Sequence, residues 1–160
     1  MAVVELHSDF VLPRGCIDMG EMDAAQVRER TEAARSWVHA LANSHGASAA
    51  ERSADGVIRS FDVFVVDGLG LWLLHNRFVA VIGAVRHEPA PGRGWAVDQT
   101  FVDFAIPDHL QSWGPTVPAA EDLNVHLTTE RWGDVSARAR TYADTYKPET
   151  VAQVLFNYWD

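Results

Sequence analysis

The chain has 160 residues, 48% of them hydrophobic, and a formal net charge of −9. This length can bury the core of one domain, and the hydrophobic content argues against intrinsic disorder. The negative charge and the lack of a basic run disfavour nucleic-acid binding, because affinity for phosphates comes from Lys and Arg. We therefore expect a single domain over residues 1–160 with no nucleic-acid partner.

The first residues, MAVVELHSDFVLPRG, have neither a basic leader nor a long apolar core, so we expect no signal peptide. No apolar stretch approaches the roughly 18 residues that span a bilayer, and we expect a cytoplasmic protein with no membrane partner. Cys16 is the one cysteine of the chain. An internal disulfide and a cysteine-rich zinc site are therefore excluded.

Residues 23–44 predict an amphipathic helix. Asp23 and Gln26 have the spacing of a capping box, in which two side chains satisfy N–H groups at a helix start. The apolar stripe repeats at steps of four and three residues, through Val27, Thr31, Ala34, Val38 and Leu41. The small polar residues that follow, 47–56, are expected to form a surface loop.

The middle of the chain predicts strands. Residues 57–66 are β-branched and aromatic, and Asp67-Gly68 is a common hairpin turn before a second strand at 69–74. Residues 77–85 form a nearly continuous apolar run, which is typical of a strand buried on both faces. We expect residues 94–101 (GWAVDQTF) to return antiparallel to it.

The last third predicts a loop and two helices. Residues 106–126 contain three prolines and are expected to form a long ordered loop. One helix is expected to start near Asp134 and another at Pro148, since Pro is favoured at the first helical position. The predicted fold class is α+β, with an antiparallel sheet packed against an N-terminal helix and C-terminal helices.

Two polar residues flank the predicted central strand pair. If 77–85 and 94–98 form a hairpin, His75 and Asp98 lie at the same edge of the sheet. A carboxylate there can accept the imidazole Nδ1–H, fix its tautomer and stabilise its charged form. Cys16 is the thiol available as nucleophile, because a nearby His⁺ or helix N-terminus lowers a thiol pKa. The hypothesis is a triad of Cys16, His75 and Asp98.

The segments RGCID, HNRFVAVI and GRGWAVDQTF, in this order, resemble the transglutaminase-like branch of the papain-like thiol enzymes. Members of that family carry a Gly-Cys turn at a helix start, a His opening a strand and an Asp ending the next strand. The resemblance implies acyl transfer or hydrolysis of an amide or ester on an α+β core. It does not set the substrate, which we expect to be a small molecule or a peptide.

The remaining site residues follow from this hypothesis. Gln99 is a candidate oxyanion donor, and Trp113, in a Pro-rich loop after the Asp98 strand, is a candidate for lining a substrate cleft. We expect no cofactor and no metal, although His7 and Asp9 before Cys16 leave a small N/O/S site open. The sequence does not set the oligomeric state.

Plain structural roles compete with each of these assignments. Cys16 can be a small buried hydrophobe, His75 a turn histidine and Asp98 a turn cap. Two other functions therefore stay open. One is a non-catalytic binding or partner protein, and the other is an acid–base enzyme with an apolar ligand cup that uses His75 and Asp98 without Cys16.

Overall fold

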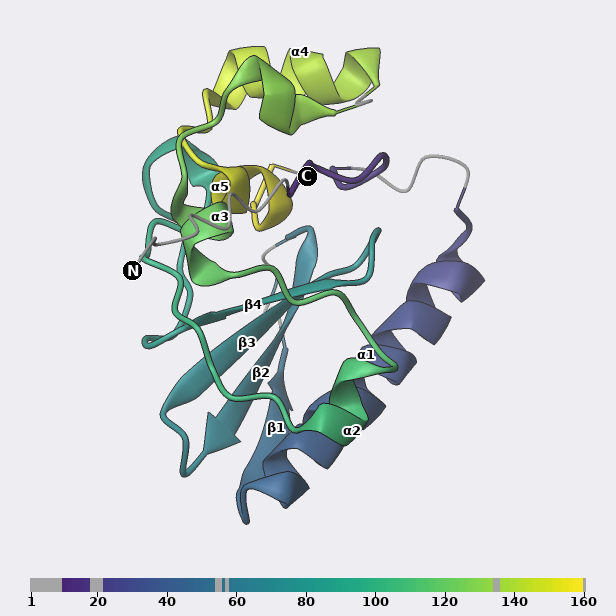
Figure 1. The fold of residues 1–160 in the computed structure, drawn as a ribbon. Helices are drawn as coiled ribbons and strands as arrows, with labels where there is room; N and C mark the ends of the chain where they lie inside the picture. The colour runs from purple at the N-terminus through teal and green to yellow at the C-terminus, as the bar shows by residue number, and fades with distance from the viewer. Residues whose placement is uncertain (1–9, 18–21, 54–55, 57, 134–135, 160) are drawn as a thin grey trace, which may run out of the picture.

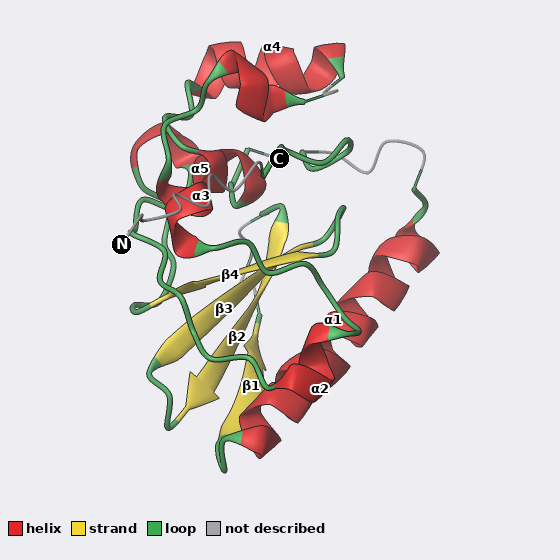
Figure 2. Cartoon of the chain, viewed as in Figure 1, coloured by secondary structure: helices red, strands yellow, loops and turns green. Residues whose placement is uncertain are grey.

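The computed structural model describes residues 10–17, 22–53, 56, 58–133 and 136–159. A long N-terminal helix packs on one side of a four-stranded sheet with the short helix at Asp108–Gln111 beside it, and the other helices of the C-terminal half lie beyond the other side of the sheet (Figure 1). The predicted α+β class, with an antiparallel sheet between an N-terminal helix and C-terminal helices, is confirmed (Figure 2).

Helix α1 spans Ala24–Ser44, as its capping residues predict. The Gln26 N–H donates to Asp23 Oδ1 over 2.8 Å, and the Asp23 N–H donates to Gln26 Oε1 over 2.9 Å. These two bonds satisfy N–H groups that a helix start leaves without a partner. The buried stripe of α1 then faces the sheet, through Ala34, Trp37, Val38, Leu41 and Ala42.

The sheet is a meander in which each strand pairs antiparallel with the next. Its strands are β1 (Ser48–Arg52), β2 (Phe61–Asp67), β3 (Leu71–Asn76) and β4 (Val81–Val85). The hairpin predicted at Asp67-Gly68 joins β2 to β3, and Gly68 adopts a φ of 92° that favours glycine. The expected surface loop at 47–56 is wrong in part, because β1 lies within it and pairs with β2.

The two edges of the sheet differ. Strand β1 is exposed apart from the half-buried Ala49, and among the described strands it pairs with β2 alone. Strand β4 is buried, and its outer edge bonds to two later segments. Thr116 forms a parallel bridge with Val81, and Val102 forms an antiparallel bridge with Ala84.

Residues that alternate along each strand belong to two hydrophobic clusters, one on each face of the sheet. We call the first the α1-side cluster; it includes Trp37, Leu41, Phe64, Leu73 and Ile82. We call the second the C-terminal cluster; it includes Cys16, Phe61, Leu74, Phe101, Leu155 and Phe156. The C-terminal residues therefore cover the face that α1 leaves open.

Short helices and turns build the C-terminal half: η1 (Arg93–Trp95), α2 (Asp108–Gln111), α3 (Ala120–Asn124), η2 (Thr129–Trp132), α4 (Ala137–Tyr146) and α5 (Val151–Leu155). The expected loop at 106–126 thus contains two helical turns. Helix α5 begins after its N-cap Thr150 and not at Pro148, since the Thr150 side chain accepts the Gln153 N–H. Asp134 lies outside the described residues.

The strand expected at 94–101 is wrong. Its first residues belong to the η1 turn, where Trp95 has a φ of 55°, a left-handed conformation that an extended strand does not contain. The N–H of Val97 then donates to Phe156 over 3.1 Å. This segment therefore pairs with the end of the chain and not with β4.

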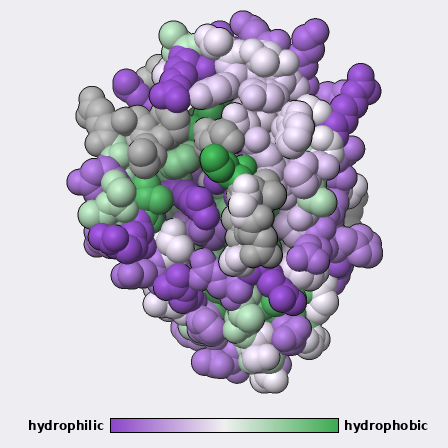
Figure 3. All heavy atoms as spheres, turned by 180° about the vertical axis from the view of Figure 1, so that it is seen from behind, coloured by the Kyte–Doolittle hydropathy of each residue, from purple (hydrophilic) through white to green (hydrophobic). Residues whose placement is uncertain are grey.

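The face of the molecule opposite to the view of Figure 1 is largely polar. Seen from behind, hydrophilic side chains dominate, and hydrophobic ones appear only in small separate patches (Figure 3). Within the described ranges, none of the helices combines the length and the apolar character needed to cross a membrane.

Candidate functional site

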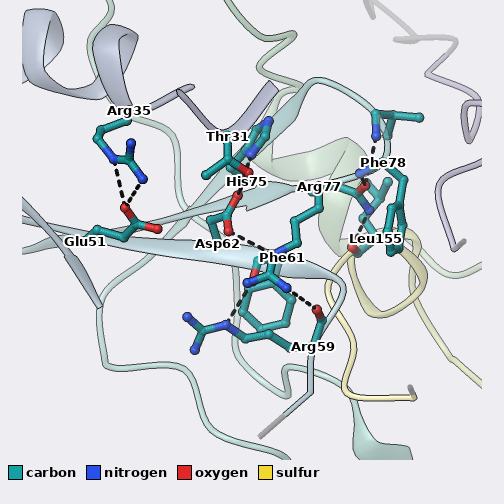
Figure 4. A network of polar contacts seen from close by, with 12 residues as sticks. Thr31, Arg35, Glu51, Arg59, Phe61, Asp62, His75, Arg77, Phe78 and Leu155 are labelled. Carbon is teal, nitrogen blue, oxygen red and sulfur yellow. Dashed lines mark hydrogen bonds and ion pairs between the residues drawn. The ribbon is translucent and has the colours of Figure 1, made fainter. Parts of the chain in front are cut away.

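A buried polar network lies between α1 and the sheet, around Asp62. Asp62 of β2 stands directly opposite His75 of β3 in the strand register. His75 Nδ1 lies 3.1 Å from Asp62 Oδ2, and Arg77 Nε donates to Asp62 Oδ1 over 2.9 Å. The Thr31 hydroxyl of α1 donates to Asp62 Oδ2 over 2.8 Å. Figure 4 shows these side chains converging on the carboxylate. We call Thr31, Asp62, His75 and Arg77 the Asp62 network.

This network is closed to solvent at its centre. The side chains of His75 and Asp62 are only 1% and 3% exposed, whereas Arg77 reaches the surface with 33% exposure. Burial raises the pKa of the Asp62 carboxyl, but the hydrogen bonds from His75, Arg77 and Thr31 outweigh it and hold that pKa below its ordinary value. Asp62 is therefore an ionised acceptor that ties two strands to α1.

The structure gives His75 a different carboxylate partner from the one expected. Asp98 is exposed, and the chain around it pairs with the C-terminal segment, so no contact joins Asp98 to His75. Gln99, the candidate oxyanion donor, uses its Nε2 to donate to the Glu88 carbonyl over 3.2 Å. The physical reason is the η1 turn, which replaces the return strand that was to bring residue 98 beside residue 75.

Cys16 lies on the other face of the sheet. Asn76 follows His75 in β3, so its side chain points to the opposite face. Its Nδ2 donates to the carbonyl of Cys16 over 2.8 Å and to that of Leu155 over 2.7 Å. The Cys16 side chain is 1% exposed and packs in the C-terminal cluster, whereas the His75 ring faces α1. The structure does not bring Cys16, His75 and Asp98 together.

A sequence signal for the true partner of His75 exists. The hairpin turn after Asp67 sets the register of the two flanking strands. The two-residue turn predicted at Asp67-Gly68 would pair Asp62 with Leu73, whereas the loop is two residues longer, pairs Val66 with Leu71 and so places Asp62 opposite His75. A carboxylate inside the apolar run SFDVFVV was the unusual residue, since a charge in such a strand needs a partner.

Trp113 is different, because the structure places it at a cleft. The cleft has a volume of about 450 Å³ and lies between α1 and the segment from Ile106 to Val117. The Trp113 side chain is 46% exposed. Trp37 of α1 also lines the cleft and is buried, and its Nε1–H donates to the Leu110 carbonyl over 3.1 Å. One indole is thus fixed in the wall, and the other is accessible to solvent.

Two anchors hold the cleft segment in place. Gly114 lies against Trp37 with a φ of 89°, and a Cβ on it would overlap the Trp37 indole. Thr116 is paired with the edge of the sheet, where its N–H donates to the Ala80 carbonyl over 2.7 Å and its carbonyl accepts from Ile82 over 2.9 Å. Contacts at Gly114 and Thr116 therefore hold the chain that follows Trp113 and preform this wall of the cleft.

The described part of the chain holds no group of three or more His, Cys, Asp or Glu side chains that could bind a metal ion. His7 and Asp9 lie outside it. Comparisons of the chain with protein-family models, with curated proteins and with solved structures find no match.

Proposed function

We propose that this protein is a binding protein that holds a small molecule or a peptide side chain in the Trp113 cleft. The observation that carries the proposal is the half-exposed Trp113 indole beside a cleft of about 450 Å³. Ligand pockets of proteins have volumes of about 300–1,000 Å³ and combine aromatic walls with a few polar groups. The volume and the two tryptophans fit that description.

The fixed position of the cleft segment supports the same proposal. Binding loses affinity when a loop must be ordered at the moment of association. Here the Gly114 contact with Trp37 and the Thr116 pairing with β4 hold the segment before any ligand arrives. A ligand can stack on Trp113 without that entropic cost.

The lining favours binding over catalysis. Its side chains are those of Trp, Ile, Leu, Gln, Ser, Pro, Thr and Val, with one Gly. They offer hydrogen bonds and apolar contact, whereas proton transfer uses groups such as His, Asp, Glu or Lys. The Asp62 network serves the packing of α1 on the sheet and is closed to solvent.

A fragment screen by NMR tests this proposal. Neutral and charged fragments are added to ¹⁵N-labelled protein, and the indole N–H signals of the tryptophans are followed. We expect some fragments to shift the signals of Trp113 and Trp37. Trp113→Ala is expected to abolish these shifts, because it removes the accessible ring.

Trp95→Ala is the matched control. Trp95 is even more exposed, at 59%, but lies in the η1 turn and does not line the cleft. Binding is expected to persist in this variant. Fragments that bind Trp113→Ala as well as the original protein would rule out the cleft as the binding site, and a screen without any Trp113 response would reject the proposal.

A further inference from the structure

We propose that the ligand of the Trp113 cleft is a neutral, hydroxyl-rich ring, the chemistry of a pyranose in a neutral oligosaccharide. This inference rests on the binding function proposed above and specifies its ligand class. Three properties of the lining carry it: its described residues include no ionisable side chain, the Trp113 indole is accessible, and two polar atoms, Gln111 Oε1 and the Thr116 hydroxyl, make no hydrogen bond with the described residues.

The first property is charge. The described residues that line the cleft include none of Asp, Glu, Lys, Arg or His, although 22% of the residues of the chain are charged. The carboxylate of Asp108, in the preceding helical turn, accepts from the Gln111 amide over 3.4 Å. A charged ligand group entering the cleft would lose water without gaining a counter-ion from the lining, which is unfavourable. The lining therefore selects a neutral ligand.

The second property is the indole of Trp113. An indole has flat, weakly negative faces, and Trp113 is 46% exposed. The C–H face of a sugar ring is also apolar and nearly flat, and packing it on an indole buries apolar area and gains dispersion contacts. Trp37 cannot take this role, since it is buried in the wall of the cleft with its N–H bonded to Leu110.

The third property separates a sugar from a purely aromatic ligand. Gln111 donates through Nε2, but its Oε1 accepts no hydrogen bond from the described residues, and the hydroxyl of Thr116 makes none with them either. A sugar hydroxyl donates and accepts, so it can pair with both groups. An aromatic hydrocarbon would remove them from water without a partner, at a loss of affinity.

The test is a titration of the full chain with three neutral trisaccharides, maltotriose, cellotriose and chitotriose, with trigalacturonate as the charged comparison. We expect at least one neutral trisaccharide to shift the indole N–H signal of Trp113 and the amide signal of Thr116, with a dissociation constant in the millimolar range or below. Retention of the protein on the matching insoluble polymer would identify a glycan chain as the ligand. Binding of the trisaccharide without such retention would identify a free sugar as the ligand, and both results support the inference.

Variants make the test specific. Trp113→Ala is expected to weaken binding at least tenfold. Thr116→Val removes only the hydroxyl and is expected to weaken it several-fold, whereas Thr116→Ser retains it. Trp95→Ala is the control and should bind as the original protein does. The far-ultraviolet circular dichroism of each variant verifies that the fold is intact.

Three results would overturn the inference: no neutral trisaccharide binds, trigalacturonate binds as tightly, or binding is insensitive to Trp113→Ala. The failure is distinguishable from that of the proposed function. If aromatic fragments occupy the cleft and sugars do not, the sugar inference fails and the binding function stands. If neither occupies it, both fail.

Discussion

Asp62→Asn is expected to lower the free energy of unfolding by about 2–4 kcal/mol at pH 7, as the hydrogen bonds around Asp62 indicate. The amide keeps the shape of the side chain but removes its charge and one of its two acceptor atoms. His75 is 1% exposed and cannot replace the lost carboxylate with water. A buried polar group left without its partner costs about 1–3 kcal/mol.

The other two hydrogen-bond partners of Asp62 contribute less to the expected loss of stability. The Thr31 hydroxyl loses a charged acceptor, at a cost of about 1–2 kcal/mol. Arg77 is one-third exposed and regains water, so its share is below about 1 kcal/mol. The neutral amide is also easier to bury than a carboxylate, which offsets part of the loss.

Urea denaturation followed by tryptophan fluorescence measures this change. The matched control is Asp98→Asn, the same substitution at an exposed position. It is expected to change the free energy of unfolding by less than about 0.5 kcal/mol. If Asp62→Asn is no more destabilising than Asp98→Asn, the Asp62 network does not hold α1 on the sheet.

Three further predictions follow from the same geometry. The pKa of Asp62 is lowered in the folded state, so the stability that its carboxylate provides is complete above the unfolded pKa of about 3.9 and is lost as the pH falls through the lower, folded value. Urea titrations should therefore show the free energies of unfolding of the original protein and of Asp62→Asn converging at this low pH. A constant difference between the two free energies would contradict this. Gly114→Ala should lower the free energy of unfolding by about 2–4 kcal/mol, because the new Cβ combines a left-handed φ with overlap on Trp37. A decrease below about 0.5 kcal/mol in thermal denaturation would show that the cleft segment adapts. Cys16 should react with iodoacetamide far more slowly in the folded protein than in urea, since it is 1% exposed. Rapid labelling of the folded protein below pH 7 that His75→Ala slows would instead support the thiol triad.

Local patterns predicted the elements whose signals lie within a few residues. The capping box of Asp23 and Gln26 set the start of α1, and the Asp67-Gly68 turn set the β2–β3 hairpin. Both depend on contacts between sequence neighbours. Strand β1 was missed because its sequence SAAER has weak strand propensity, and its pairing with β2 outweighs that preference.

Predicting the partner of His75 required the register of the paired strands as well as the pattern of residue types. Asp98 was chosen because a return strand was expected at 94–101, but the left-handed turn at Trp95 directs that segment to the C-terminal residues. A pairing over such a sequence distance leaves no local signal. The carboxylate of Asp62 inside an apolar strand was visible in the sequence, but its register opposite His75 depends on the length of the β2–β3 loop. The separation of Cys16 and His75 onto opposite faces depends on the packing of Leu12, Cys16 and Ile17 in the C-terminal cluster.

Trp113 was singled out by its place in a Pro-rich loop, and the structure puts it on a cleft. The opposite wall of that cleft, Trp37, lies 76 positions earlier in α1 and is not part of the apolar stripe predicted for that helix. The sequence could therefore identify the accessible side of the site but not the surface that it faces.

The unequal edges of the sheet bear on how the protein avoids aggregation. An edge strand with unsatisfied backbone groups can pair with another chain. At β4 the segments around Val102 and Thr116 occupy that edge, so the most apolar strand offers little to a second molecule. The exposed edge belongs to β1, which is short and carries Glu51 and Arg52. The apolar strands are thus enclosed, and the strand left open is one whose length and charges discourage intermolecular pairing.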